Sequence, residues 1–315
     1  MPDKDSSQAE YAGFWRRSAA TLIDLVILGL IGAFIGFAFK PQLIELGAGG
    51  RLIGFLIAAV YFALLDGQPG KGQTAGKRLL KIKVVGRDGN FISIPRAFLR
   101  YLPLAIPFFL NGANLGSELL FSAWAYPISF CIFGLGLIGL YLLIFNTPSR
   151  RALNDLMAST MVLRSHAASV TALPSPKRLH LSISALIGAL TLIIPAFTLP
   201  LTQHESFSSL RDIQRSLDEQ PGVIYAEVLS GRFMNKGTTK QYLDIKVHIR
   251  NQSMMTELSA ARLANTAMHT APDVTRLDTI QITFIYGYDL GFTRVSQGTG
   301  FSASPTEWQR KSAID

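Results

Sequence analysis

The segment AATLIDLVILGLIGAFIGFAF, residues 19–39, decides the fold class of this protein. Asp24 is the single charged residue among these 21. A helix needs about 20 predominantly apolar residues to cross the hydrocarbon core of a bilayer. The segment therefore predicts a membrane-spanning helix.

Four further apolar segments predict additional spans, at residues 52–65, 98–115, 119–145 and 180–201. The composition agrees, because 49% of the residues are hydrophobic and 16% are charged, against about a quarter charged in soluble proteins. We expect a membrane all-α helical bundle of about five transmembrane helices, joined to a small soluble α+β domain.

Basic residues gather in three places beside the apolar segments. Arg16 and Arg17 precede the first span, loop 66–100 contains eight Lys and Arg, and residues 146–179 contain five. Cytoplasmic loops of membrane proteins carry this excess of positive charge. All three places should face the cytoplasm, so the region 98–145 should hold two helices with a break near Asn111–Glu118, and the C-terminal part should lie outside.

The expected organisation has four parts: a cytoplasmic N-terminus (1–18), a transmembrane domain (19–165), a cytoplasmic linker with the fifth helix (166–202) and an extracytoplasmic domain (203–315). The last part holds 12 basic and 12 acidic residues, so the net charge of +9 lies beside the spans. This distribution argues for membrane topology and against nucleic acid as a partner.

Alternation in YLDIKVHIRN (242–251) is typical of a half-buried strand. The pattern of residues 203–315 predicts the order α-β-β-α-β-β.

The glycine-rich loop DGQPGKGQTAGKRLLKIKVVGRDGN (66–90) does not fit a phosphate-binding loop. Lys71 stands where the first glycine of a Walker A motif belongs, and Arg78 stands where its hydroxyl residue belongs. We expect a cytoplasmic loop whose bases lie at the membrane face near anionic lipid headgroups: Lys77, Arg78, Lys81 and Lys83. Residues 77–85 are predicted to form a short strand or interfacial segment that pairs with residues 152–164, bringing Asp155 near these bases.

Asp24 is the candidate functional residue within the membrane. Burying an ionisable side chain in a spanning helix costs at least about 2.5–3.5 kcal/mol, so such a group normally faces a partner or a watery cavity. It is either an ion or proton site, or half of a structural pair with Arg17, which lies two helical turns earlier on the same face.

The sequence gives little support for a disulfide, a metal site or an enzyme active site. The single cysteine, Cys131, excludes an internal disulfide and a cysteine-rich metal site. The five histidines show no metal-binding spacing, and the soluble part has no catalytic motif. We expect a protein that is not an enzyme and carries no cofactor and no metal.

Three separated segments together resemble the RDD family of bacterial membrane proteins: YAGFWRRSAATLIDLVILGL (11–30), GQTAGKRLLKIKVVGRDGNFISIPRAFLRYL (72–102) and RRALNDLMASTMVLR (150–164). The family is named for an arginine and two aspartates. The resemblance assigns the arginine to Arg17, with Arg16 as the alternative, and the first aspartate to Asp24. It assigns the second to Asp155, with Asp66 and Asp88 as alternatives.

The resemblance implies a multi-pass protein of the bacterial cytoplasmic membrane and a link to ion- or proton-coupled transport. The alternative is a membrane scaffold or sensor whose outer domain, 203–315, binds a protein or envelope ligand. Expected partners are the lipid bilayer, anionic headgroups, further copies of the chain and an extracytoplasmic ligand.

Overall fold

A computed structural model describes residues 11–147, 150–167, 175–201, 205–235 and 238–313. Parts of the expected N-terminus 1–18 and of the linker 166–202 lie outside these residues. The chain forms two compact units, each described here by itself. Unit 1 contains residues 1–34, 51–197 and 290–293, and unit 2 contains the remaining residues, including 35–50.

The expected helical bundle is present. Four helical segments are long and apolar enough to cross a membrane: Phe14–Glu45, Gly47–Asp66, Ala125–Phe145 and Arg178–Pro200. They correspond to α2 (Phe14–Glu45), α3 (Gly50–Asp66), the continuous run of α7 (Ala125–Ser129), η2 (Phe130–Gly134) and α8 (Leu135–Phe145), and the pair α10 (Arg178–Thr191) and α11 (Ile193–Leu201).

The remaining predicted span, 98–115, forms α5 (Ile94–Leu110), which begins and ends earlier than expected. Its 17 residues rise about 25 Å, near the lower limit for crossing a bilayer. The predicted break after it is confirmed, because the helix ends at Leu110 and the next short helix, α6, covers Ser117–Leu120.

The helices expose apolar side chains as well as burying them. On α3, Leu52, Leu56 and Val60 follow one another at intervals of four residues and are 50–61% exposed. On α2, Leu22 and Leu30 are also largely exposed. Residues four apart lie on the same helix face, so these rows form apolar outer surfaces. A continuous apolar surface of this kind suits contact with lipid and not with water.

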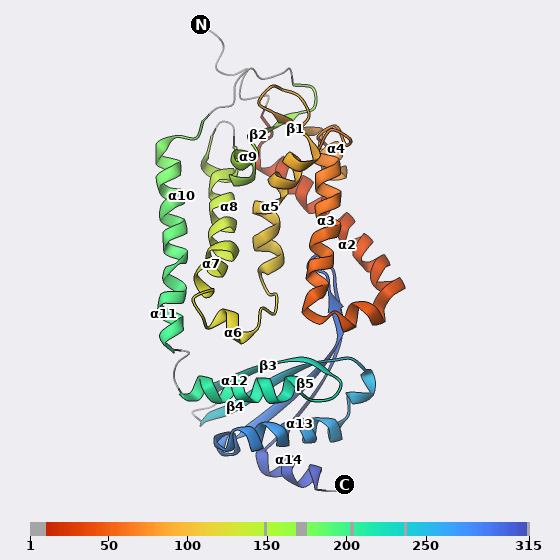
Figure 1. The fold of residues 1–315 in the computed structure, drawn as a ribbon, viewed down its shortest axis with the longest axis vertical. Helices are drawn as coiled ribbons and strands as arrows, with labels where there is room; N and C mark the ends of the chain where they lie inside the picture. The colour runs from red at the N-terminus through yellow and green to blue at the C-terminus, as the bar shows by residue number, and fades with distance from the viewer. Residues whose placement is uncertain (1–10, 148–149, 168–174, 202–204, 236–237, 314–315) are drawn as a thin grey trace. The chain divides into compact units, whose positions relative to one another are not determined.

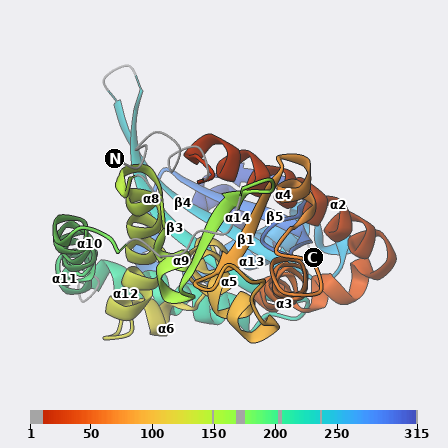
Figure 2. The same cartoon turned by 90° about the horizontal axis from the view of Figure 1, so that it is seen from above.

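A small cap covers one end of the unit 1 helices. Strands β1 (Ile82–Gly86) and β2 (Thr160–Arg164) pair antiparallel, with Ile82 opposite Arg164. The short helices α4 (Ala75–Leu79) and α9 (Leu153–Met157) lie beside them (Figures 1 and 2). The predicted pairing of the two segments is thus confirmed. This cap places loop residues at the ends of α2, α3 and α5.

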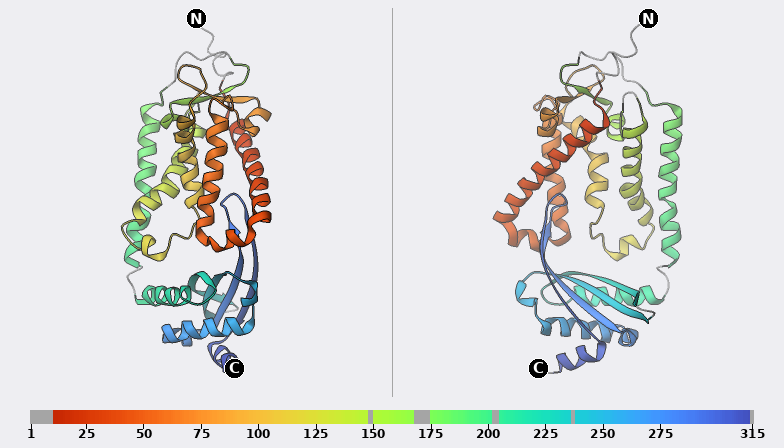
Figure 3. Two further views of the ribbon diagram at one scale, coloured as in Figure 1. Left: turned by 45° about the vertical axis from the view of Figure 1, so that its right-hand side comes forward. Right: turned by 180° about the vertical axis from the view of Figure 1, so that it is seen from behind.

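Unit 2 has the predicted order, with α12 (Glu205–Asp218), β3 (Val223–Asn235), β4 (Thr238–Ile249), α13 (Glu257–Thr270), β5 (Thr279–Asp289), β6 (Arg294–Ala303) and an additional short helix, α14 (Pro305–Ser312). The sheet order is β3-β4-β5-β6, with β4 and β5 parallel and the outer pairs antiparallel. Figure 3 shows the helices running beside the sheet. One core, which includes Leu217, Ile245, Phe284 and the fully buried Trp308, holds sheet and helices together.

Candidate functional site

Five charged side chains meet where the cap joins the helices. Arg17 lies in the first turn of α2, Asp66 ends α3, Lys77 lies on α4, Arg100 lies on α5, and Asp155 lies on α9. None is more than 9% exposed. We call this set the charge network. Because its members come from five elements, it can form only in the folded protein.

The charges of the network alternate in sign. Asp155 accepts from Arg17 Nη2 and, through Oδ1, from Arg100 Nε at 3.0 Å and Nη2 at 2.8 Å. The other nitrogen of Arg100, Nη1, donates to Asp66 Oδ2 at 2.7 Å. Asp66 Oδ1 in turn accepts from Lys77 Nζ. Each carboxylate therefore lies between two cations, which is the arrangement that makes a buried charge tolerable.

Local hydrogen bonds also hold Asp155 in place. Its Oδ2 accepts from the backbone N–H of Ala152 at 3.2 Å, and its Oδ1 accepts from the Thr160 hydroxyl at 3.3 Å. Burial acts to raise the pKa of Asp155, but the charges of Arg17 and Arg100 outweigh it and lower the pKa to about 2. Asp155 is a permanent anion at neutral pH.

Lys77 is not an exposed base at the membrane face, as the loop was expected to present. Its ammonium is buried and paired with Asp66, whereas the neighbouring Arg78 is exposed. Burial lowers the pKa of Lys77, although the charge of Asp66 opposes this effect. Of the other predicted bases, Lys81 is exposed and Lys83 is half-buried. The headgroup prediction stays open for Arg78, Lys81 and Lys83.

Asp24 occupies a separate site on α2. Its Oδ1 accepts from the Tyr61 hydroxyl and from the backbone N–H of Gly76, both at 2.8 Å, and its Oδ2 accepts from the Thr74 hydroxyl at 2.6 Å. Asp24 is fully buried, and in the described part of the chain no Lys, Arg or His forms an ion pair with it. Its carboxylate is held by neutral donors alone.

Glycine is required where α4 meets α2. A Cβ on Gly76 would lie 2.2 Å from the backbone oxygen of Ala20, which is far inside van der Waals contact. The missing side chain lets the Gly76 N–H reach Asp24. Thr74 caps α4 through its side chain, which accepts from the Lys77 N–H while donating to Asp24.

The structure separates two residues that the sequence placed on one helix face. Arg17 does not pair with Asp24, because its guanidinium turns to Asp155, 138 positions later. Arg16, the alternative arginine, is exposed. Of the alternative aspartates, Asp66 belongs to the charge network. Asp88 lies in the exposed turn after β1, where its carboxylate accepts from Asn90.

The sequence does not identify three contributors. It gives Arg100 only as one of the loop bases and does not single out Tyr61 or Thr74, whereas Asp66 is an alternative for the second aspartate of the family. Only Thr74 had a local signal, because a threonine before Ala-Gly-Lys is a favourable helix N-cap. Tyr61 and Arg100 acquire their roles through packing of distant segments.

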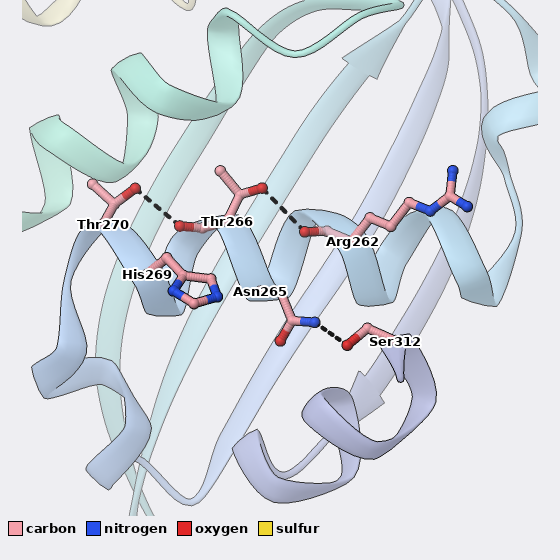
Figure 4. Close-up of a pocket in the computed structure, with 6 residues that line it drawn as sticks. All are labelled: Arg262, Asn265, Thr266, His269, Thr270 and Ser312. Carbon is pink, nitrogen blue, oxygen red and sulfur yellow. Dashed lines mark hydrogen bonds between the residues drawn. The ribbon is translucent and has the colours of Figure 1, made fainter. Parts of the chain in front are cut away.

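The described residues line hollows in both units. A cavity of about 630 Å³ within unit 1 is lined by α2, α3, α5 and α8 and includes Arg17, Lys77 and Arg100 in its wall. The other is an open depression on unit 2, between α13 and α14 (Figure 4). There the hydroxyls of Thr266 and Thr270 donate to carbonyls of their own helix. The depression is lined by polar side chains, of which Asn265 Nδ2 donates to the Ser312 hydroxyl.

The charge network and Asp24 all come from residues 17–155. A family comparison matches residues 11–159 to the RDD family. Residues 11–159 form an RDD family domain. The chain is 27% identical over 151 residues to the uncharacterized protein YckC of Bacillus subtilis strain 168, a match that covers 48% of this chain and 83% of YckC. No solved structure matches the chain.

Replacing Arg17, which belongs to the charge network, should destabilise the RDD domain. Arg17→Gln leaves Asp155 buried with one cation fewer, and breaking a buried pair typically costs about 3–5 kcal/mol. Arg16→Gln removes the same charge from an exposed neighbour and should change stability by about 0.5 kcal/mol or less. Thermal unfolding of both variants in detergent checks this. Equal melting temperatures for the two variants would contradict the assignment of Arg17 to the network.

The low pKa of Asp155 predicts how its contribution depends on pH. A depressed carboxyl pKa stabilises above the unfolded value of about 3.9, and that stability is lost as pH falls towards the folded value of about 2. The melting-temperature difference between wild type and Asp155→Asn should stay constant from pH 7 to 5 and shrink from pH 4 to 2. A difference that already shrinks between pH 7 and 5 would argue against a permanent anion.

Proposed function

We propose that the protein is an ion- or proton-coupled membrane transport protein, without enzymatic activity, in which Asp24 is the ionisable site. The observation that carries this proposal is the contrast between Asp24 and the charge network. Asp24 lies within a spanning helix and is held by neutral donors, whereas Asp66 and Asp155 each lie between two cations. Intramembrane carboxyl groups often belong to ion pathways or proton relays.

The hydrogen bonds around Asp24 suit both protonation states. The Gly76 N–H can only donate, so Oδ1 stays an acceptor. Oδ2 faces the Thr74 hydroxyl, whose hydrogen can rotate and whose oxygen can accept a second bond beside that from the Lys77 N–H. A proton on Oδ2 would therefore be satisfied by Thr74 without movement of the backbone.

The carboxylates of the charge network cannot take up a proton as easily as Asp24. Protonating Asp155 would leave the guanidinium groups of Arg17 and Arg100 facing a neutral partner, and the pKa of about 2 reflects that cost. Asp66 is held in the same way by Arg100 and Lys77. The network is suited to holding the end of the bundle together while Asp24 changes its charge.

We place the protein in the bacterial cytoplasmic membrane, with the N-terminus and the β1–β2 cap inside and residues 203–315 outside. The charge network contributes three cations and two anions, so it accounts for little of the basic excess. Exposed bases supply the rest, since Arg16, Lys71, Arg78, Lys81 and Arg87 all lie at the cap end. The positive-inside rule then favours a cytoplasmic cap.

The test is proton flux in proteoliposomes driven by gradients of Na⁺, K⁺ or Li⁺. Asp24→Asn keeps the shape and most hydrogen bonds of the side chain but cannot release a proton. We expect flux to fall to background in this variant while the folded protein remains in the membrane.

Asp88→Asn is the matched control, since it removes an exposed carboxylate from the same domain and should leave flux unchanged. Flux in Asp24→Asn equal to wild type would reject Asp24 as the site. Absence of flux in every oriented preparation would reject transport of these ions.

A second candidate function, a scaffold or sensor, is favoured by the surface of unit 2. Strand β3 is an edge of the sheet and exposes Leu229, Phe233 and Met234 by 47–77%. An exposed apolar edge strand is a common place for another protein to add a strand. In this proposal unit 2 binds an extracytoplasmic protein and the RDD domain anchors it.

Introducing positive charge on the exposed edge of β3 should abolish the binding of an extracytoplasmic protein. Leu229→Lys together with Phe233→Lys should release a partner that co-purifies from cross-linked membranes. The control is Arg310→Glu on exposed α14, which should retain it. A co-purification pattern identical in all three proteins would speak against β3 as the binding edge.

A further inference from the structure

The cavity of unit 1 has two chemically different ends. Its apolar walls include Leu25 and Leu28 of α2, Phe108 of α5, and Leu135 and Leu143 of α8. Its volume of about 630 Å³ lies within the range of about 300–1,000 Å³ that holds small molecules. These side chains offer a ligand no hydrogen bonds, so this part fits a hydrocarbon.

The other end is basic. Three cations of the charge network, Arg17, Lys77 and Arg100, line it, together with one carboxylate, Asp66. Lys77 Nζ carries three hydrogens, and Asp66 is its one hydrogen-bond partner within the described residues. Lys77 therefore keeps donors for an anion, and the three cations exceed the two carboxylates of the charge network, Asp66 and Asp155, by one charge.

Asn154 gives independent evidence for a polar ligand at the same end. It lines the cavity and is 2% exposed, yet its Oδ1 has no hydrogen-bond partner among the described residues. A buried amide oxygen without a partner is unfavourable, and nearly all such groups in folded proteins are hydrogen-bonded. The amide can present either its oxygen or its NH₂ group after a flip, so a headgroup with oxygens or hydroxyls would satisfy it.

We propose that this cavity binds an anionic amphiphile with a hydrocarbon chain. The anionic head lies at Arg17, Lys77 and Arg100 beside Asn154, and the chain lies between α2, α5 and α8. The head end lies where the helices reach the cap, at the depth where lipid headgroups lie if the cap is at the membrane surface. This binding goes beyond the proposed transport and does not depend on Asp24.

Gly139 offers a way to fill the chain-binding part. It lies on α8 in the cavity wall, and a Cβ at this position would meet nothing within 4 Å. A large side chain can therefore enter the cavity without displacing the backbone. Leu137, on the same helix, is 50% exposed and does not line the cavity, so Leu137→Trp adds bulk to the outer surface instead.

The experiment photolabels the full-length protein in phosphatidylcholine vesicles containing one diazirine probe. The probes are a long-chain fatty acid, phosphatidylglycerol and phosphatidylcholine, and labelled peptides are mapped by mass spectrometry. We expect an anionic probe to label the walls on α5 and α8 at least about five times more than phosphatidylcholine. Labelling by the fatty acid alone identifies a free acid as the ligand, and labelling by phosphatidylglycerol identifies a phospholipid.

The variants decide whether the labelled place is the cavity. Gly139→Trp should reduce wall labelling at least about fivefold, and Leu137→Trp should leave it unchanged. Gly139→Leu, a smaller change, should give an intermediate loss and replaces the tryptophan variant if that protein is not monodisperse. Equal labelling by the three probes, or wall labelling insensitive to filling at Gly139, would overturn the proposal.

Discussion

The bridging of Asp155 by two arginines is the interaction on which the rest of the membrane domain depends. Asp155 comes from the cap, Arg17 from the start of α2 and Arg100 from α5. In a low-dielectric interior none of these charges is tolerable alone. Satisfying them fixes where the cap lies over the helix ends, and Asp66 and Lys77 extend the same requirement to α3 and α4.

This fixed cap also builds the surroundings of Asp24. Lys77 belongs to the network through its ammonium and to the Thr74 cap through its backbone N–H. The loop that supplies Thr74 and Gly76 to Asp24 is therefore anchored by the charge network. Counted together, the five network charges and an ionised Asp24 sum to zero. In the proposed transport cycle, a proton or cation bound at Asp24 would therefore give the region a net positive charge.

Much of the architecture could be predicted from the sequence because it rests on local patterns. The apolar run around Asp24 predicts its spanning helix, and alternation in residues 242–251 predicts a strand of unit 2. The pairing of β1 with β2 was also predictable. The sequence gives no comparable signal for the partner of Arg17. The spacing of seven residues on one helix suggests Asp24 as the partner, whereas the actual partner, Asp155, is 138 residues away.

The same limit explains why the sequence does not distinguish the buried Lys77 from the exposed Arg78. Consecutive residues of a helix point about 100° apart, so Lys77 turns inward to Asp66 while Arg78 turns outward. In the sequence both are loop bases beside a membrane segment. Which of them is buried depends on how α4 is rotated against α2, and Gly76, which has no Cβ to keep the two apart, decides that rotation.

The central claim is that Asp24 is the site at which an ion or proton binds in the proposed transport. The most direct measurement is the infrared difference spectrum of the protein in membranes when Na⁺, K⁺ or Li⁺ replaces a large organic cation at constant pH, following the carboxyl bands. We expect an ion-induced carboxyl band that disappears in Asp24→Asn and persists when the exposed control, Asp88, is changed to Asn. An ion-induced band unaffected by Asp24→Asn would contradict the claim.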